Sequence, residues 1–255
     1  MAAPLIDTHT HLGDPVFDED RAEVLGRARR AGVQSVIVVT ETFGEVDRNL
    51  ALAQEHPELR LGFGLYPTYL DLDQAERFVD AIRAHRDRLV AIGEVGLDRW
   101  KVKDEDDRRR QRDLFGRFID LAREVDLPVN VHSRSAGHYA IDLLVEMRAP
   151  RVQMHAFDGK VGHALRGIEA GFFFSVPPSV VRSAQKQKLV RALPLERLLL
   201  ETDSPVLGPS REERNEPAHV VVALTAIAEL KDLEVARVRD QIYENTVQLY
   251  GDAIL

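Results

Sequence analysis

The 255-residue chain contains no cysteine. This absence excludes a disulfide framework and a thiolate metal site, and it leaves histidine and carboxylate side chains as the candidate metal ligands. The chain also lacks an apolar run near the roughly 20 residues that a membrane-spanning helix needs, and residues 1–7 lack the charged and apolar regions of a secretory leader. We therefore expect a cytoplasmic protein with no membrane partner.

Positive charge is in deficit as well, because Lys+Arg 34 against Asp+Glu 42 gives a net charge of −8. Such a charge argues against a protein that holds polyanions through its overall field, so any contact with nucleic acid must be local. Neither GxGxxG nor GxxxxGK[ST] follows a predicted strand. This second absence disfavours an open doubly wound sheet, which is the main alternative to the fold predicted below.

Short β-branched runs alternate along the chain with longer segments of helical periodicity. Apolar residues spaced as Leu114, Phe118 and Leu121 are typical of a helix that packs on one face. This alternation predicts parallel βαβ units with the helices outside the sheet, and eight such units would close into a barrel. The predicted strands are residues 5–11, 35–40, 59–64, 89–95, 129–132, 151–155, 171–176 and 198–202.

The remaining segments fit the same architecture. Residues 217–255 predict two further helices that separate near residues 231–233, and Asp71 or Asp73 and Ser133 or Ser135 are expected to cap helix starts. No low-complexity linker interrupts the chain, and one α/β barrel can fill its whole length. We predict an α/β protein with a TIM-like (β/α)8 barrel and extra C-terminal helices, formed as one domain by residues 1–255.

The first predicted strand carries a possible metal-binding pair. Side chains alternate across a strand, so Asp7, His9 and His11 share one face. Two imidazoles on one face can hold a divalent ion, although such a pair also occurs as polar surface or in strand-end hydrogen bonding. This pattern alone leaves both interpretations open.

Ligand-type residues recur at the ends of other predicted strands, namely Glu94, His132, His155 and Asp203. The carboxyl ends of parallel barrel strands open onto one face, so these side chains should converge with the histidine pair. The alternative is that each is a separate hydrogen-bonded group at a strand end. Convergence predicts a metal site, and imidazole with carboxylate suits zinc, manganese or iron. The other histidines are predicted in helices or at helix ends and are not expected to be ligands: His56, His85, His138, His163 and His219.

Six short motifs together resemble those of the TatD family of metal-dependent hydrolases, and they span nearly the whole chain. They are residues 7–12 (DTHTHL), 93–98 (GEVGLD), 127–134 (LPVNVHSR), 155–159 (HAFDG), 201–205 (ETDSP) and 214–217 (RNEP). Residues 174–179 (FSVPPS) and 182–188 (RSAQKQK) are similar to the subgroup of TatD-domain deoxyribonucleases called type 3. The resemblance implies a barrel of the amidohydrolase superfamily, DNA as substrate and two divalent ions, with zinc, magnesium and manganese as the candidates.

The resemblance also implies roles for individual residues. His9, His11 and Asp203 would hold one ion, and the second ion would be held by His132 and His155. Glu94 would bridge the two, which a carboxylate can do because it has two oxygens. Asp203 and Glu94 are the candidate catalytic residues, and Asp203 is the expected acceptor of a proton from the attacking water. Glu201 is expected either to orient a ligand imidazole or to be a locally paired strand carboxylate.

The candidate substrate contacts are Tyr66 and Arg134. Tyr66 in residues 64–67 (GLYP) stands where the family usually has histidine in Gly-x-His-Pro, so a contact to the scissile phosphate or leaving group is altered. Arg134 offers a fork of donors to a phosphate, and its alternative is a structural ion pair. Trp100 would stack a base or pack over the barrel mouth, and residues 182–188 would bind phosphate or form a solvated helix face.

These features leave three classes of function open. The first is a metal-dependent deoxyribonuclease that acts on single strands or from an end, because a strand end can enter a barrel mouth that a duplex cannot. The second is a metallohydrolase of small-molecule or acyl esters, such as a D-aminoacyl-tRNA deacylase. The third is a barrel kept as a binding scaffold without activity. No obligate protein partner is expected in any of the three.

Overall fold

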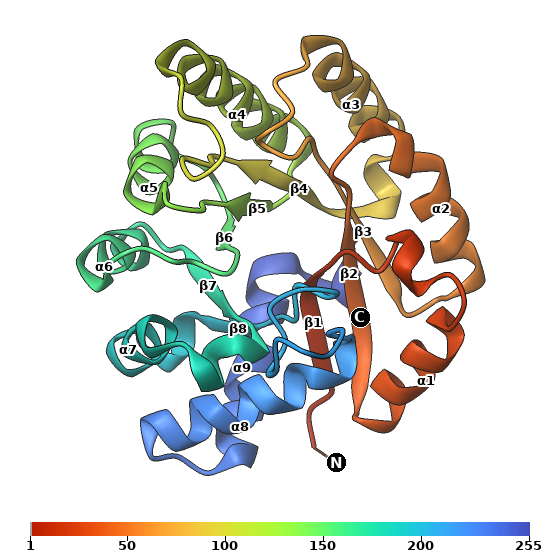
Figure 1. The fold of residues 1–255 in the computed structure, drawn as a ribbon, viewed down its shortest axis with the longest axis vertical. Coiled ribbons are helices and arrows are strands. Elements are labelled where there is room, and N and C mark those ends of the chain that lie inside the picture. Colours follow the sequence, from red (N-terminus) through yellow and green to blue (C-terminus); the bar gives the residue numbers. More distant parts are fainter. Residues whose placement is uncertain (1) are drawn as a thin grey trace.

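The computed structural model describes residues 2–255, and its centre is one eight-stranded parallel sheet with the strands in chain order (Figure 1). The sheet closes into a barrel where the segment after β8 pairs with β1. The Asp203 amide donates to the His9 carbonyl at 2.9 Å, and Thr10 forms a bridge with Ser204. The TIM-like barrel predicted from the sequence is confirmed. Its strands are β1 (Leu5–Thr10), β2 (Val33–Val39), β3 (Leu59–Phe63), β4 (Leu89–Gly96), β5 (Val129–His132), β6 (Val152–Met154), β7 (Phe173–Val176) and β8 (Leu198–Leu200).

Helices surround the barrel and connect its strands (Figure 1). Their buried faces form one apolar layer with the outward side chains of the strands, as Phe78, Phe118 and Ile141 show. The helices are α1 (Arg21–Arg30), α2 (Val46–Glu55), α3 (Leu72–Ala84), α4 (Glu105–Val125), α5 (Gly137–Glu146), α6 (Val161–Glu169), α7 (Ala184–Ala192), α8 (Val220–Lys231) and α9 (Val235–Tyr250).

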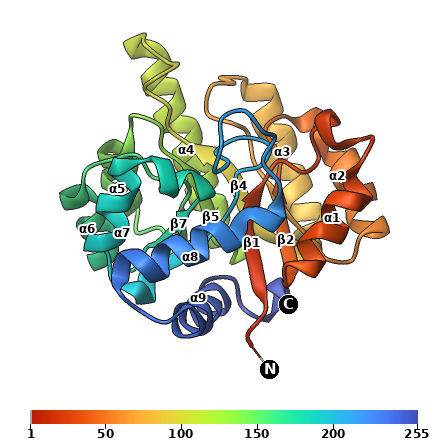
Figure 2. The same ribbon diagram turned by 60° about the horizontal axis from the view of Figure 1, so that its bottom comes forward.

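The two C-terminal helices predicted from the sequence are α8 and α9. Helix α9 lies at the end of the barrel where both chain termini are found (Figure 2). Leu249, Tyr250 and Ile254 belong to the same buried cluster as the strand residues Ile6 and Leu199. The C-terminal segment therefore seals this end of the barrel, and the carboxyl ends of the strands form the mouth at the other end.

Local details differ from the sequence predictions in two ways. Asp71 caps α3 as expected, since its side chain accepts from the Gln74 amide, but neither Ser133 nor Ser135 caps α5. That helix begins after Ala136 without a side-chain cap, because the chain first makes a tight turn with Ser135 at a φ of 54°. Strand β8 ends at Leu200, since the Thr202 amide and hydroxyl both donate to the Asp7 carboxylate.

Within residues 2–255 none of the helices has the length and apolar character that crossing a membrane requires. The cytoplasmic location and the single domain over residues 1–255 stay predictions.

Candidate metal centre at the barrel mouth

Two histidines from the end of β1 meet the carboxylate that follows β8. The His9 and His11 Nε2 atoms lie 3.4 Å apart, and they lie 3.6 Å and 3.3 Å from Asp203 Oδ1. Asp203 adopts a left-handed φ of 56°, which aspartate tolerates better than most residues. The structure thus brings together the three residues expected to hold one ion, within 4.8 Å of one another.

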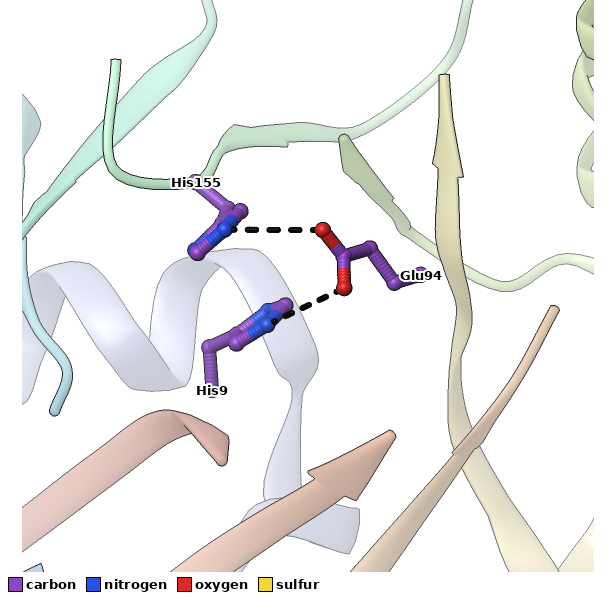
Figure 3. A group of neighbouring side chains, drawn as sticks. All are labelled: His9, Glu94 and His155. Carbon is purple, nitrogen blue, oxygen red and sulfur yellow. Dashed lines mark ion pairs between the residues drawn. The ribbon is translucent and has the colours of Figure 1, made fainter. Parts of the chain in front are cut away.

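Glu94 on β4 lies between two imidazoles and is 1% exposed. Its Oε2 atom is 3.6 Å from His9 Nε2, and its Oε1 atom is 3.6 Å from His155 Nε2 (Figure 3). The two carboxylate oxygens therefore face different histidines. This is the arrangement that a bridging carboxylate needs.

Buried partners fix the tautomers of two of these histidines. Asn130 donates from Nδ2 to the Thr8 carbonyl, so its Oδ1 accepts from His9 Nδ1 at 2.9 Å. In the same way, Glu201 Oε2 accepts from His155 Nδ1 at 2.9 Å. In the neutral imidazoles the Nε2 atoms consequently point lone pairs at the carboxylates. Glu201 thus contacts a histidine as expected for an orienting carboxylate, and it is also paired locally, since it accepts from the Ser175 hydroxyl and the Ala156 amide.

The nitrogen and oxygen atoms that converge at the centre are suited to bind a cation. Glu94 Oε2 is buried and has no hydrogen-bond partner among residues 2–255. An unpaired buried carboxylate oxygen is costly, and here it faces the Nε2 atoms of His9 and His11, which in the neutral rings carry lone pairs and cannot donate to it. Imidazole nitrogens and carboxylate oxygens that converge in this way are the ligands of divalent metal ions.

His132 is held differently from the other histidines. Its Nδ1 atom lies 2.6 Å from Glu94 Oε1, and its Nε2 atom lies 3.1 Å from Asp98 Oδ2. Burial by itself lowers the pKa of His132, but the charge of Glu94 and the bond to Asp98 outweigh it and raise the pKa to about 9. Within the described chain, no group of three ligand atoms closer than 4.8 Å includes His132, so its pairing with His155 on one ion stays a prediction.

The buried imidazoles and carboxylates of the centre shift one another's pKa values. Burial raises the pKa of Glu94, but His132 and His9 counter it and hold that pKa well below its usual range. His155 and His11 likewise outweigh burial and lower the pKa of Asp203. The pKa of His11 is raised to about 10 because Asp203 and Glu94 overcome the effect of burial. Protonation of these imidazoles and binding of cations are therefore alternative ways to compensate the buried carboxylates.

Three residues at the centre were not identified from the sequence. Asp98 lies in the 93–98 motif, but only the structure shows its bond to His132. Glu41 follows β2, and its Oε1 atom lies 3.6 Å from His11 Nδ1, so the criterion of a carboxylate at a strand end could have found it. Asn130 points into the barrel from β5, where no local signal distinguishes it from a structural amide.

The candidate substrate contacts lie beside His132. The Tyr66 ring packs edge-on against the His132 imidazole, with ring centroids 4.9 Å apart, and burial raises the pKa of its hydroxyl. Arg134 is exposed, makes no ion pair within residues 2–255 and stacks its guanidinium over Trp100. The structural ion pair considered for Arg134 is therefore wrong for the described part of the chain.

The basic run at residues 182–188 is tied to the backbone of neighbouring loops. Arg182 Nε donates to the Gly208 carbonyl, and Lys186 Nζ donates to the Ala156 carbonyl at 2.8 Å. These two charges are not on a freely solvated helix face. A phosphate contact by this run stays a prediction.

Asn130→Ala is expected to weaken metal binding about 10- to 100-fold, because groups that hydrogen-bond to ligand histidines have effects of this size. The substitution removes the acceptor that holds the His9 ring in its tautomer. Metal affinity measured by calorimetry checks this, with Asn245→Ala as the control. Asn245 is equally buried and donates to two carbonyls near the start of β8, far from the mouth. Equal affinities in the two variants would contradict the role of Asn130.

Comparison with known proteins agrees with this geometry. A family model described as TatD related DNase matches residues 6–251. The human protein named deoxyribonuclease TATDN3 is 42% identical over 262 residues, which cover 96% of this chain and 94% of the human protein. A protein of Methanocaldococcus jannaschii named as an uncharacterized metal-dependent hydrolase is 33% identical, with 96% of each chain covered. The crystal structure of YJJV from Escherichia coli, described as a TatD homolog, superposes with a TM-score of 0.90 at 30% identity and covers 98% of this chain and 99% of that one.

Proposed function

The chain belongs to the TatD family, and from this premise we propose that it is a deoxyribonuclease that hydrolyses phosphodiester bonds of single strands or strand ends. Membership makes it a metal-dependent hydrolase. The observation that carries the proposal is the placement of Glu94, whose two oxygens face His9 and His155 with one oxygen unpaired. A carboxylate held between two sets of nitrogen ligands suits two-ion phosphodiester hydrolysis.

We propose that two divalent ions bind here, with zinc, magnesium and manganese as candidates. His9, His11 and Asp203 would hold the first ion, His132 and His155 would hold the second, and Glu94 would contribute one oxygen to each. When bound, such ions lower the pKa of water and stabilise the charge that develops on a phosphoryl oxygen.

The protein's own residues supply the remaining steps. Asp203 is ionised over the working pH range because its pKa is lowered, so it can accept the proton of the attacking water. Asn130 and Glu201 hold the imidazoles of His9 and His155 in a fixed orientation. Arg134 offers unpaired donors to a phosphate, and the Tyr66 hydroxyl, which has no hydrogen-bond partner in the described chain, is free to donate to the substrate. We propose both as substrate contacts.

The proposal is tested by a substrate panel with and without chelator. We expect the purified protein to hydrolyse a single-stranded oligodeoxynucleotide, to lose this activity with a chelator, and to regain it when zinc, magnesium or manganese is restored. The panel includes duplex DNA, a bis-aryl phosphate and a D-aminoacyl-tRNA. Turnover of the aminoacyl-tRNA alone would show that the protein is an acyl-ester hydrolase and not a deoxyribonuclease. Chelator-insensitive binding without turnover of any substrate would indicate a scaffold.

A further inference from the structure

Beside the metal centre, the loops after β4 and β5 and the first turn of α5 present cations and aromatic rings together. The loops are joined where the Arg99 amide donates to the Arg134 carbonyl at 3.0 Å. The Arg134 guanidinium carbon lies 3.7 Å from the centroid of the Trp100 ring, and that of Arg99 lies 3.2 Å from the centroid of Tyr139. We call Arg99, Trp100, Lys101, Arg134 and Tyr139 the rim strip.

The cations of the rim strip are not neutralised. Within residues 2–255 the side chains of Arg99, Lys101 and Arg134 form no ion pair with a carboxylate. The acid next in sequence, Asp98, is turned inward, where it accepts from the Lys101 amide and contacts His132. On α4 nearby, by contrast, three successive arginines are paired within the helix: Arg108 with Glu105, Arg109 with Asp106, and Arg110 with Asp107.

An exposed ring accompanies these charges. Trp100 is 48% exposed although tryptophan is usually well buried, and it lies on a mouth loop rather than over the barrel core. The packing role considered for Trp100 therefore accounts for only part of its surface. Aromatic faces interleaved with unpaired cations are the surface that single-stranded nucleic acid binds, since bases stack on the rings while phosphates meet the cations.

The rim strip is continuous with the metal centre. His132 lies two residues before Arg134, and Asp98, which contacts His132, lies directly before Arg99. A nucleic-acid strand whose scissile phosphate lies at the metal centre would therefore contact the rim strip with its adjacent nucleotides. The strip also supplies local positive charge in a protein whose net charge is −8.

We propose that the rim strip binds the part of a single-stranded nucleic acid that extends out of the mouth, with a base stacked on Trp100 and phosphates at Arg99, Lys101 and Arg134. This inference rests on the proposed function and adds the location and kind of substrate contact. Duplex bases are already stacked on one another, so the strip selects unpaired strands. Substrates that reach the strip should be bound better than small phosphodiesters that occupy only the centre.

Trp100 is the only tryptophan in the chain, so tryptophan fluorescence, excited selectively over that of the five tyrosines, reports on the strip alone. We expect quenching when the wild-type protein is titrated with a single-stranded oligonucleotide of about eight nucleotides, a typical site size. Phosphorothioate linkages in the probe slow its hydrolysis during the titration. A matched duplex and a mononucleotide should produce much weaker quenching. Unchanged fluorescence at saturating single strand would overturn the proposal.

Variants test the same strip by selectivity. Trp100→Ala should lower the ratio of kcat/KM for the single-stranded oligonucleotide to that for a bis-aryl phosphate by about tenfold, as loss of one stacked base does, and Trp100→Phe should restore part of it. Arg99→Ala should reduce the slope of log affinity against log salt by about 0.7, because one phosphate contact is lost. Arg83→Ala is the control, since Arg83 is paired with Glu124 at the end of α3 away from the mouth and should change neither quantity.

Different results would contradict the rim strip and the deoxyribonuclease activity. If wild-type protein cleaves DNA but Trp100→Ala keeps the wild-type selectivity and the titration shows no quenching, the rim strip is wrong and the deoxyribonuclease stands. If wild-type protein cleaves no DNA, the deoxyribonuclease is wrong, and the titration alone decides whether the strip binds single strands.

Discussion

Glu94→Gln is expected to lower kcat/KM for single-stranded DNA by about 10³-fold or more, while the protein stays folded. The amide keeps the size of the side chain but removes its charge, and it replaces one oxygen with a donor that no ion can use as a ligand. Loss of one preorganised group that stabilises transition-state charge typically costs 10²- to 10³-fold, and here the same change disturbs both proposed ion positions. Glu94→Ala and His132→Ala should abolish hydrolysis as well.

A comparison variant separates this effect from a general loss of charge at the mouth. Glu41→Gln also removes a carboxylate of the centre, whose ligand atom lies within 4.8 Å of those of His11 and Glu94. Glu41 is partly exposed and contacts only one imidazole, His11, so we expect a smaller loss of about tenfold, the size of one polar contact. Steady-state kinetics on one substrate, together with thermal unfolding of each variant, makes the comparison. If folded Glu94→Gln keeps kcat/KM within tenfold of the wild type, Glu94 has no essential role in the reaction.

Asp203→Asn is expected to lower kcat by about 10²- to 10⁴-fold, the usual contribution of a positioned general base. The amide has the shape of the carboxylate but cannot accept the proton of the attacking water. Asp203 is ionised in the wild type because His155 and His11 lower its pKa against the effect of burial, so the loss should persist across neutral and mildly acidic pH.

The control for Asp203 is Asp158→Asn, which changes an exposed carboxylate on the loop after β6. Within residues 2–255 Asp158 accepts only from the Ser135 amide, and it lies outside the centre, so we expect nearly unchanged kcat. The kcat values of both variants are measured with saturating metal, which limits the effect of a weakened ligand. Wild-type kcat in Asp203→Asn would exclude this residue as the proton acceptor.

The barrel could be predicted because its signals are local. Alternation of β-branched runs with helical periodicity is visible in short windows of sequence, and strand ends follow directly from it. The convergence of His9, Glu94, His155 and Asp203 then follows from barrel geometry alone, since parallel strands open at one face.

Contacts between distant residues could not be predicted in this way. Asn130 orients His9 across 121 positions of sequence, and Tyr250 donates to Gln153 from the C-terminal helix that seals the barrel. Such pairings depend on which inward side chains meet, and polar residues on a buried strand give no sign of their partners. The double contact of His132 with Glu94 and Asp98 is of the same kind.

The net charge illustrates the same limit. A value of −8 argues against binding through the overall field, yet it conceals how charges are paired. Arginines on α4 are neutralised by acids one helical turn away, whereas Arg99 and Arg134 have no such partner in the described chain. The distribution of ion pairs, which only the structure shows, decides where a phosphate can bind.

The central claim is that Glu94 joins two ion positions, and metal content per chain tests it most directly. Wild-type protein and Glu94→Gln are saturated with a divalent metal, and unbound metal is removed. The metal content per chain is then measured by inductively coupled plasma mass spectrometry. We expect two ions per chain in the wild type and fewer than two in the variant. A single ion in the wild type, or two ions in both proteins, would contradict it.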